Sequence, residues 1–330
     1  DFQRLILVTL KTYDLYHLKA FYGIPEEGGD AWISQIFQKI FFIYSQDRRF
    51  CFALRERLEK AKAWEWREDE ALMTLSLVMS AMDERVMEAE FVTIPAGTFV
   101  MGSPYFESGR EGDEILHKVT LEKDFEMQTT EVTQLQWYQV MENNPSRFKE
   151  KEYCASDYTE IDGISICPNH PVENVSWNEV QLFISRLNER DARYQYRLPT
   201  EAEWEVAARG LKTEEWIKLL EEGGMGGPAY SFGDDSRLLS EFGWFGGNSG
   251  GQTHAVAQKT PNAFGLYDMH GNVREWTFDV YMQDSLRRVI RGGSWRVAPE
   301  FCRSAYRHRG LPDYHPINGD IGFRLVKGEK

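Results

Sequence analysis

The first 90 residues carry apolar side chains at helical spacing. After a turn at residues 24–29, this spacing continues through Trp32, Ile33, Ile36, Phe37, Ile40 and Phe41. A second stripe, with steps of three and four, consists of Leu72, Leu75, Met79, Met82 and Val86. These patterns predict a helical bundle over residues 1–90, whose stripe packs on its own domain or, as the alternative, receives a helix of a partner. Because the segment holds one histidine and no tight acid–base cluster, we expect an interaction or adaptor module.

The pattern changes after Glu90, where short β-branched and aromatic runs alternate with turns rich in Gly, Pro, Asn and Asp. Residues 91–330 therefore form a second predicted domain. One helix is expected from residues 131–133 onward. Another is expected from Ser176, which with Glu179 fits a capping box. The fold class is α+β, with a small antiparallel sheet and long loops of the kind that often carry function.

Charge and hydropathy exclude two classes of function. The chain of 330 residues has 38 basic and 52 acidic side chains, a net charge of −14, which disfavours binding to nucleic acid. Its longest apolar run spans residues 40–44, whereas a membrane-spanning helix needs about 20 apolar residues. We therefore expect no membrane span. The compartment stays undetermined: a cytoplasmic location is slightly favoured, and an exported form is the alternative.

Four cysteines are too few and too scattered for a disulfide framework. Cys154 and Cys167 bracket one loop, so they form a disulfide in an oxidising compartment or remain two thiols in a reducing one. Cys302 has no neighbour in the sequence with metal-ligand spacing and is interpreted as a small buried apolar residue.

Eight blocks of the second domain stand in the order found in a known superfamily. They are residues 91–102 (FVTIPAGTFVMG), 130–133 (TEVT), 171–177 (PVENVSW), 197–205 (RLPTEAEWE), 262–269 (NAFGLYDM), 271–276 (GNVREW), 291–295 (RGGSW) and 321–324 (IGFR). The chain thereby resembles the formylglycine-generating (sulfatase-modifying factor) superfamily, which implies a C-type-lectin-like fold. By themselves, Thr200 and Glu203 indicate a helix start, and Arg291 and Arg324 indicate buried ion pairs.

The resemblance also implies a structural Ca²⁺ in the loop of residues 268–275. Its ligands would be the side chains of Asp268 and Glu275 and the main-chain carbonyls of Gly271 and Val273, since calcium prefers oxygen ligands. The alternative is a loop held by hydrogen bonds from backbone amides to carboxylates alone.

The superfamily's founding chemistry uses two copper-binding cysteines, and here the resemblance places Val297 at the first position and Cys302 at the second. Arg274 also replaces an aromatic residue of the founding enzymes. A second enzymatic branch uses a His-x-x-x-His-x-Glu iron motif, which this sequence lacks. We therefore expect a non-catalytic protein. The alternatives are a copper- or iron-dependent oxidoreductase built on Cys302, Ser294 and His308, or a purely structural subunit.

The segment of residues 296–320 offers aromatic and arginine side chains on loops, a composition typical of recognition surfaces. We expect it to bind a protein or another macromolecular ligand. The predicted contact residues are Arg296, Val297, Phe301, Tyr306, His308, Leu311, Tyr314, His315, Ile317 and Asn318.

The superfamily includes bacterial variable proteins of diversity-generating retroelements, in which adenine mutagenesis diversifies this same segment. Codons reachable in that way exclude Trp, Gln, Met, Lys and Glu. Between residues 296 and 320 only Glu300 belongs to that set. The resemblance therefore implies a bacterial protein whose C-terminal surface is diversified, and ordinary relatives that favour Asn, Arg, Tyr and Asp in this segment offer the alternative explanation.

Overall fold

The computed structural model describes residues 87, 89–221, 223, 226–282 and 286–330. The chain divides into two units, residues 1–84 and 85–330, and the description concerns the second. The helical bundle predicted over residues 1–90 lies outside the described residues, apart from residues 87, 89 and 90. That bundle, its apolar stripe and the domain boundary at residue 90 stay predictions.

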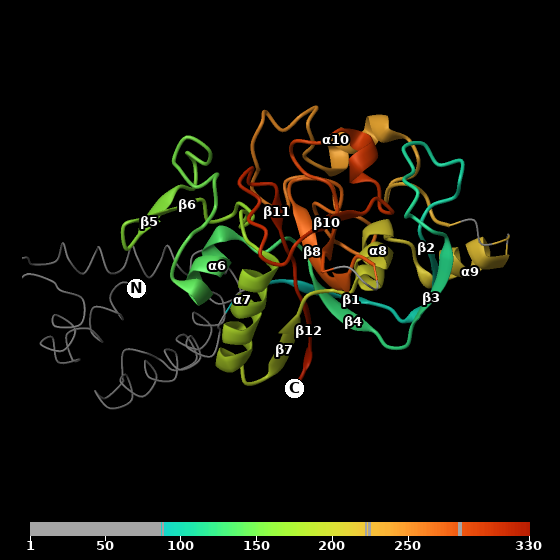
Figure 1. The fold of residues 1–330 in the computed structure, drawn as a ribbon, viewed down its shortest axis with the longest axis horizontal. Coiled ribbons are helices and arrows are strands. Elements are labelled where there is room, and N and C mark those ends of the chain that lie inside the picture. The colour runs from blue at the N-terminus through green and yellow to red at the C-terminus, as the bar shows by residue number, and fades with distance from the viewer. Residues whose placement is uncertain (1–86, 88, 222, 224–225, 283–285) are drawn as a thin grey trace, which may run out of the picture. The chain divides into compact units, whose positions relative to one another are not determined.

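The two ends of the second unit meet in one four-stranded antiparallel sheet (Figure 1). Its strands, in spatial order, are β1 (Phe91–Ile94), β4 (Phe125–Gln128), β12 (Val326–Glu329) and β7 (Tyr194–Arg197). The last strand of the chain thus pairs with two strands from far earlier in the sequence. This arrangement places β12, at the end of the chain, inside the sheet between β4 and β7.

A second sheet contains β10, which belongs to the segment of residues 296–320. Its spatial order is β10 (His308–Gly310), β9 (Arg288–Arg291), β8 (Arg274–Val280) and β11 (Ile321–Gly322). β11 runs parallel to β8 and the other pairs are antiparallel, with a register shift between Trp276 and Val280. β10 is therefore an outer strand of this sheet.

Local sequence signals explain where the main helices begin. The helices α6 (Gln134–Met141), α7 (Trp177–Arg190) and α8 (Glu201–Arg209) each start after a capping box, formed by Thr133 with Gln136, Ser176 with Glu179, and Thr200 with Glu203. In each box the hydroxyl accepts from a backbone N–H that the helix leaves unpaired. The helix starts predicted at Ser176 and Thr200 are confirmed.

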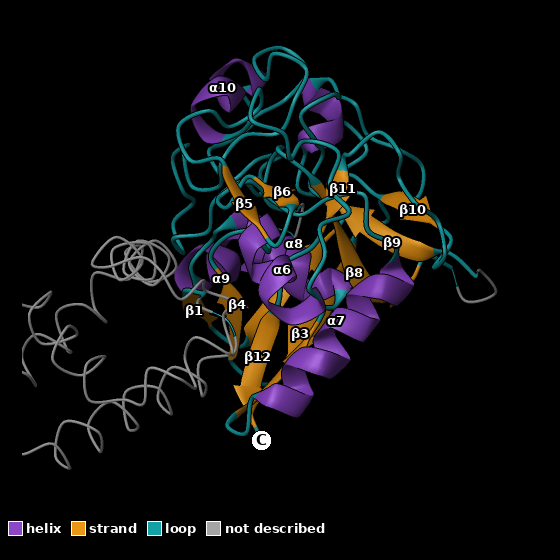
Figure 2. Cartoon of the chain, turned by 90° about the vertical axis from the view of Figure 1, so that its left-hand side faces the viewer, coloured by secondary structure: helices purple, strands orange, loops and turns teal. Residues whose placement is uncertain are grey.

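Shorter elements connect this framework. They are the pairs β2 (Gly97–Met101) with β3 (His117–Leu121) and β5 (Thr159–Ile161) with β6 (Ile164–Ile166), the helices α9 (Thr213–Glu221) and α10 (Leu239–Phe242), and the 3₁₀ turns η1 (Ser236–Leu238) and η2 (Pro299–Cys302). Loops gather at one end of the unit together with α10 (Figure 2). A disulfide joins Cys154 to Cys167, with 5.7 Å between their Cα atoms.

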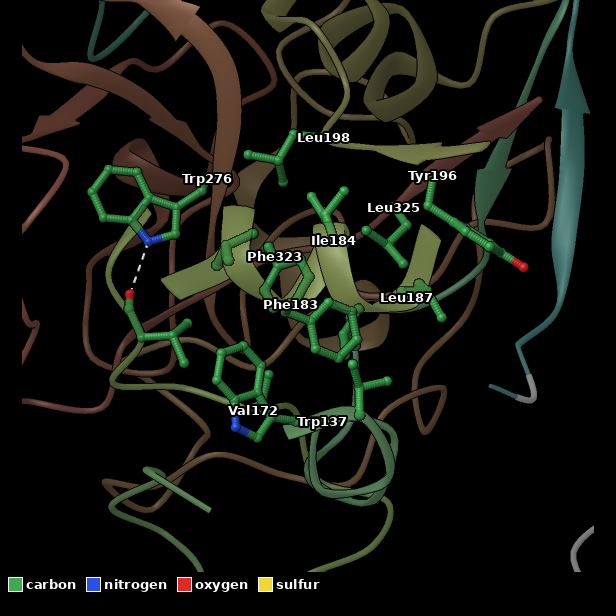
Figure 3. Packing of buried hydrophobic residues seen from close by; sticks show 14 of the residues in the cluster. Trp137, Val172, Phe183, Ile184, Leu187, Tyr196, Leu198, Trp276, Phe323 and Leu325 are labelled. Carbon is green, nitrogen blue, oxygen red and sulfur yellow. Dashed lines mark hydrogen bonds between the residues drawn. The ribbon is translucent and has the colours of Figure 1, made fainter. Parts of the chain in front are cut away.

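The main core packs between α6, α7 and the two sheets (Figure 3). Trp137 stacks on Phe183 with ring centroids 5.2 Å apart, and Phe323 meets both rings edge on. The indole of Trp276 is fully buried and donates to the Val175 carbonyl at 3.0 Å, so its polar atom is satisfied. Large aromatic side chains therefore fix how α6 and α7 sit against the C-terminal strands.

Buried ion pairs connect the loops to this core. Arg291 is almost fully buried and donates to Glu205, which also accepts from Arg209 at 2.7 Å. Arg324 is fully buried and forms two hydrogen bonds to Glu275, at 2.7 and 2.8 Å. The ion-pairing roles predicted for Arg291 and Arg324 are confirmed. In the described part of the chain, no helix is long and apolar enough to cross a membrane.

Candidate ligand-binding site

A groove of about 540 Å³ lies along β10. It contains four of the ten predicted contact residues, namely Tyr306, His308, Leu311 and Tyr314. The remaining lining residues were not predicted as contacts, and they are Glu111, Asp113, Tyr281, Arg287, Arg307, Arg309 and Gly310. The groove thus combines the C-terminal segment with the β2–β3 connection and the end of the β8–β9 hairpin.

One wall of the groove is a connected polar network centred on Tyr281. The Tyr281 hydroxyl donates to the Asp113 carboxylate and accepts from the Arg309 guanidinium at 2.7 Å. Both Arg307 and Arg309 stack on the Tyr281 ring, 4.9 and 4.6 Å from its centroid. Burial and the Asp113 carboxylate raise the pKa of Tyr281, so its hydroxyl remains protonated and keeps this network intact.

Arg307 is already neutralised within the protein. Its guanidinium makes a bidentate pair with Glu201, at 2.6 and 2.9 Å, and lies 3.7 Å from Asp113. Such fork-like pairing fixes the side chain and leaves little charge for a ligand. Arg307 therefore shapes the groove more than it attracts anions.

Arg303 anchors the connection between β2 and β3, which contributes Glu111 and Asp113 to the groove. Its guanidinium is 1% exposed and donates to both carboxylate oxygens of Glu114 at 2.7 and 2.8 Å, to Glu107 and to the Gly109 carbonyl. All three partners belong to the connection between β2 and β3. Because Glu111 and Asp113 lie on this connection, Arg303 positions the acidic side of the groove.

His308 enters the groove as a neutral imidazole. Burial lowers its pKa to about 4, helped by the charges of Arg274 and Arg309. The neighbouring Tyr306 packs edge on against Phe301, with ring centroids 5.1 Å apart. Phe301 thus supports an aromatic residue of the groove without lining it.

The other predicted contact residues lie outside the groove. Arg296 is 3.7 Å from Asp320, and Val297 packs against a small cluster around Cys302. The His315 imidazole is 3.5 Å from Glu179, while Ile317 is 77% exposed and Asn318 is half-buried. Four of the predicted contacts therefore line the groove and three lie on the loop of residues 315–319, while Arg296, Val297 and Phe301 belong to neither.

The loop that contains Ile317 and Asn318 lies against the buried carboxylate of Glu173. Glu173 accepts from the Phe148 amide at 2.8 Å, and its other oxygen has no hydrogen-bond partner. A side chain at Gly319, where φ is +68°, would come within 2.7 Å of that oxygen. Burial raises the pKa of Glu173 to about 7. Glycine at position 319 therefore allows the loop to lie directly on Glu173.

The predicted calcium loop contains one carboxylate oxygen without a partner. Asp268 is 1% exposed; its Oδ2 accepts from the Ala257 amide at 2.8 Å, and its Oδ1 has no hydrogen bond. Glu275 accepts from Arg324 and from the Trp204 indole at 2.8 Å. Desolvation raises the pKa of Asp268 to about 6. The hydrogen bonds in this loop thus leave Asp268 only partly satisfied.

A third buried carboxylate, that of Glu131, lies near Asp268 and Glu275. The sequence pattern indicated only that Glu131 stands at the start of a helix. It is fully buried and neither of its oxygens has a partner. Burial, and after it the charge of Asp268, raises the pKa of Glu131 well above its usual value. Three acidic groups therefore face one buried cation, Arg324, and this imbalance fits a bound cation.

The side chains alone do not complete a metal site. Among the described residues, no group of three or more His, Cys, Asp or Glu side chains has the geometry to hold a metal ion. A cation here would also need main-chain carbonyls, which Ca²⁺ accepts readily and which Gly271 and Val273 would supply.

The sequence matches a known family over most of its length. The family described as a sulfatase-modifying factor enzyme 1-like domain matches residues 78–329. The chain belongs to this family.

Two relatives of this sulfatase-modifying factor enzyme 1-like chain match it over more than half of its length. It is 30% identical to the chaperone protein LppX of Paenibacillus barcinonensis, over 64% of this chain and 82% of that protein. It is 28% identical to the inactive C-alpha-formylglycine-generating enzyme 2 of Bos taurus, over 78% of this chain and 96% of that protein.

Among solved structures, the chain is similar to Treponema denticola variable protein 1. The TM-score is 0.56, with 28% identity over 72% of this chain and 94% of that one. The α+β, C-type-lectin-like fold expected for the second domain is confirmed.

In this sulfatase-modifying factor enzyme 1-like chain, the two positions assigned to the catalytic cysteine pair lie in one apolar cluster. Cys302 is fully buried with Ala229, Tyr230 and Leu239, and Val297 packs against them. Burial raises the pKa of the Cys302 thiol to about 12. Without a bound metal, this sulfur is therefore a protonated core atom near neutral pH.

Proposed function

We propose that this chain is a non-catalytic member of its family that binds a protein ligand through the groove along β10. The observation that carries the proposal is a preorganised groove lined by Tyr281, Tyr306 and Tyr314, with arginines fixed around it. Tyrosines on a rigid frame supply contact area at low entropic cost and are enriched at binding hot spots. The loop of residues 315–319 extends this surface.

The cysteine positions support a binding role over an oxidative one. Only one of the two positions carries sulfur, and Cys302 is buried. The similar protein of Bos taurus is itself named inactive. An oxidoreductase using Cys302, Ser294 and His308 would need an accessible thiolate, which the burial of Cys302 opposes.

We expect Cys302 to resist iodoacetamide in the native chain because its thiol is buried and its pKa is raised to about 12. The Cys302 peptide should be alkylated only after denaturation, as measured by mass spectrometry of tryptic digests. Rapid labelling of the native protein, or copper that is lost in a Cys302→Ser variant, would favour the oxidoreductase instead.

The likeness to a variable protein supports a second part of the proposal, that residues 296–320 form a diversified binding surface. Several positions of this segment, including Leu311, Tyr314 and Ile317, are exposed, whereas Arg303 is buried and holds the fold. Exposed loop positions on a rigid frame tolerate substitution without loss of stability.

We also propose that a structural Ca²⁺ neutralises the buried acidic group. Asp268 and Glu275 would supply carboxylate oxygens, Gly271 and Val273 would supply carbonyls, and the charge of the buried Glu131, which interacts with Asp268, would favour the cation. The unpartnered oxygens of Glu131 and Asp268 support this assignment. Such an ion would stabilise the loop that leads into β8, and with it the sheet that carries β10.

The binding role is tested by a photo-crosslinking amino acid placed at Tyr314 of the full chain in its own cells. Tyr314 is 45% exposed on the groove, so we expect a discrete crosslinked partner. A Tyr306→Ala change in the same chain should reduce its yield at least about tenfold, as expected for an aromatic hot spot.

Tyr105 provides the matched control for this experiment. It is 89% exposed on the β2–β3 connection, and unlike Glu111 and Asp113 of that connection it does not line the groove. The same crosslinker at Tyr105 should not capture that partner. Equal capture from both positions, or a yield unaffected by Tyr306→Ala, would contradict a ligand site along β10.

A further inference from the structure

The groove follows the free edge of β10 and not one face of its sheet. Successive side chains of a strand point to opposite faces. Arg307, His308, Arg309 and Gly310 nevertheless all line the same groove. A groove that contacts both faces of a strand must run along its edge.

The main-chain groups of this edge are available for pairing. β10 is the outer strand of its sheet and pairs with β9 only. Within the described part of the chain, no main-chain hydrogen bond of residues 308–310 reaches beyond that ladder. Proteins usually cover or blunt such edges, and an open edge in a groove is a template for a further strand.

We propose that the groove binds an extended peptide segment of a partner protein, which pairs with β10 as an added strand. This inference rests on the proposed binding function and specifies the ligand's chemistry. Main-chain hydrogen bonds to residues 308–310 would provide affinity, and the side chains on either side of the edge would provide specificity.

The residues that line the groove determine which side chains a bound peptide should carry. Tyr306, Leu311 and Tyr314 supply apolar surface to the groove. The Arg309 guanidinium donates to the Tyr281 hydroxyl and, among the described residues, has no carboxylate within ion-pair distance, although Glu111 and Asp113 also line the groove. Because a bound strand also alternates its side chains, we expect the fitting peptide to alternate apolar and polar residues, with one acidic residue opposite Arg309.

Strand pairing is tested with peptides selected from a random phage-displayed library against the full chain. Single N-methyl groups are then placed at each position of a selected peptide, and affinity is measured by fluorescence anisotropy. Only alternate amides of an added strand would bond to β10, so every second substitution should weaken binding about three- to tenfold. Uniform tolerance, or losses at helical spacing, would overturn the proposal.

The charge of Arg309 is tested by reversal. An Arg309→Glu chain should bind an acidic peptide at least about tenfold more weakly, and a peptide with lysine at the acidic position should recover binding. Recovery also shows that the variant is folded. The control is Arg237→Glu, since Arg237 is exposed on η1 and does not line the groove. Equal effects of both variants would overturn the assigned ligand chemistry.

The outcomes separate this inference from the proposed function. If Tyr314 crosslinks a partner but no library peptide binds, strand addition is wrong and the binding function stands. If neither assay detects a ligand at the groove, both fail. If peptides bind independently of Arg309 and of N-methylation, they occupy another site and the inference is overturned.

Discussion

Replacing Arg303 with methionine is expected to lower the free energy of unfolding by about 3–5 kcal/mol. The substitution removes the cation that Glu114 and Glu107 share and leaves two carboxylates without their partner. Arg303 is buried, so solvent cannot replace the lost hydrogen bonds. Urea denaturation followed by tryptophan fluorescence measures the change.

The matched control is Arg237→Met. Arg237 also pairs with a carboxylate, that of Asp235 at 2.7 Å, but its side chain is 88% exposed. Solvent screens such a pair, so the urea midpoint should be unchanged. Equal midpoints for both variants would show that Arg303 does not connect the β2–β3 loop to the core. The Arg303 variant should also lose ligand binding, because Glu111 and Asp113 would no longer be held at the groove.

Calcium is expected to raise the melting temperature of the chelator-treated chain, and Glu131→Gln is expected to remove most of that increase. A ligand at one hundred times its dissociation constant stabilises the folded state by about 2.7 kcal/mol. Glu131 would contribute because its two buried oxygens lack partners in the protein. Calorimetry in EDTA and in CaCl₂ measures the difference.

Glu126→Gln provides the control for this prediction. Its side chain is 40% exposed and lies 3.8 Å from Lys327 on the first sheet, so the calcium response should persist in this variant. A wild-type chain whose melting temperature does not change on adding calcium would contradict the proposed site. A response retained in Glu131→Gln would leave Asp268 and Glu275 as ligands and show that the charge of Glu131 does not contribute.

Features encoded over a few neighbouring residues could be predicted from the sequence. The capping boxes at Ser176 and Thr200 are local, because an N-cap hydroxyl bonds to an amide three residues away. The ordered blocks of residues 91–324 indicated the family and its fold. The loop with Asp268 and Glu275 was recognised because its residues are close in sequence.

Only the tertiary structure decided which distant residues share a site. Glu131 shares the charged core of Asp268 although 137 positions separate them, and no local signal distinguished it from a residue that begins a helix. Likewise, Asp113 and Tyr281 reach the groove from other loops, while Ile317 and Arg296 lie outside it. Arg307 and Arg309 alternate along the chain with the predicted contacts Tyr306 and His308. They also line the groove because an edge strand exposes side chains of both faces. A cavity depends on how separate elements pack, and short-range patterns in one chain do not encode that packing.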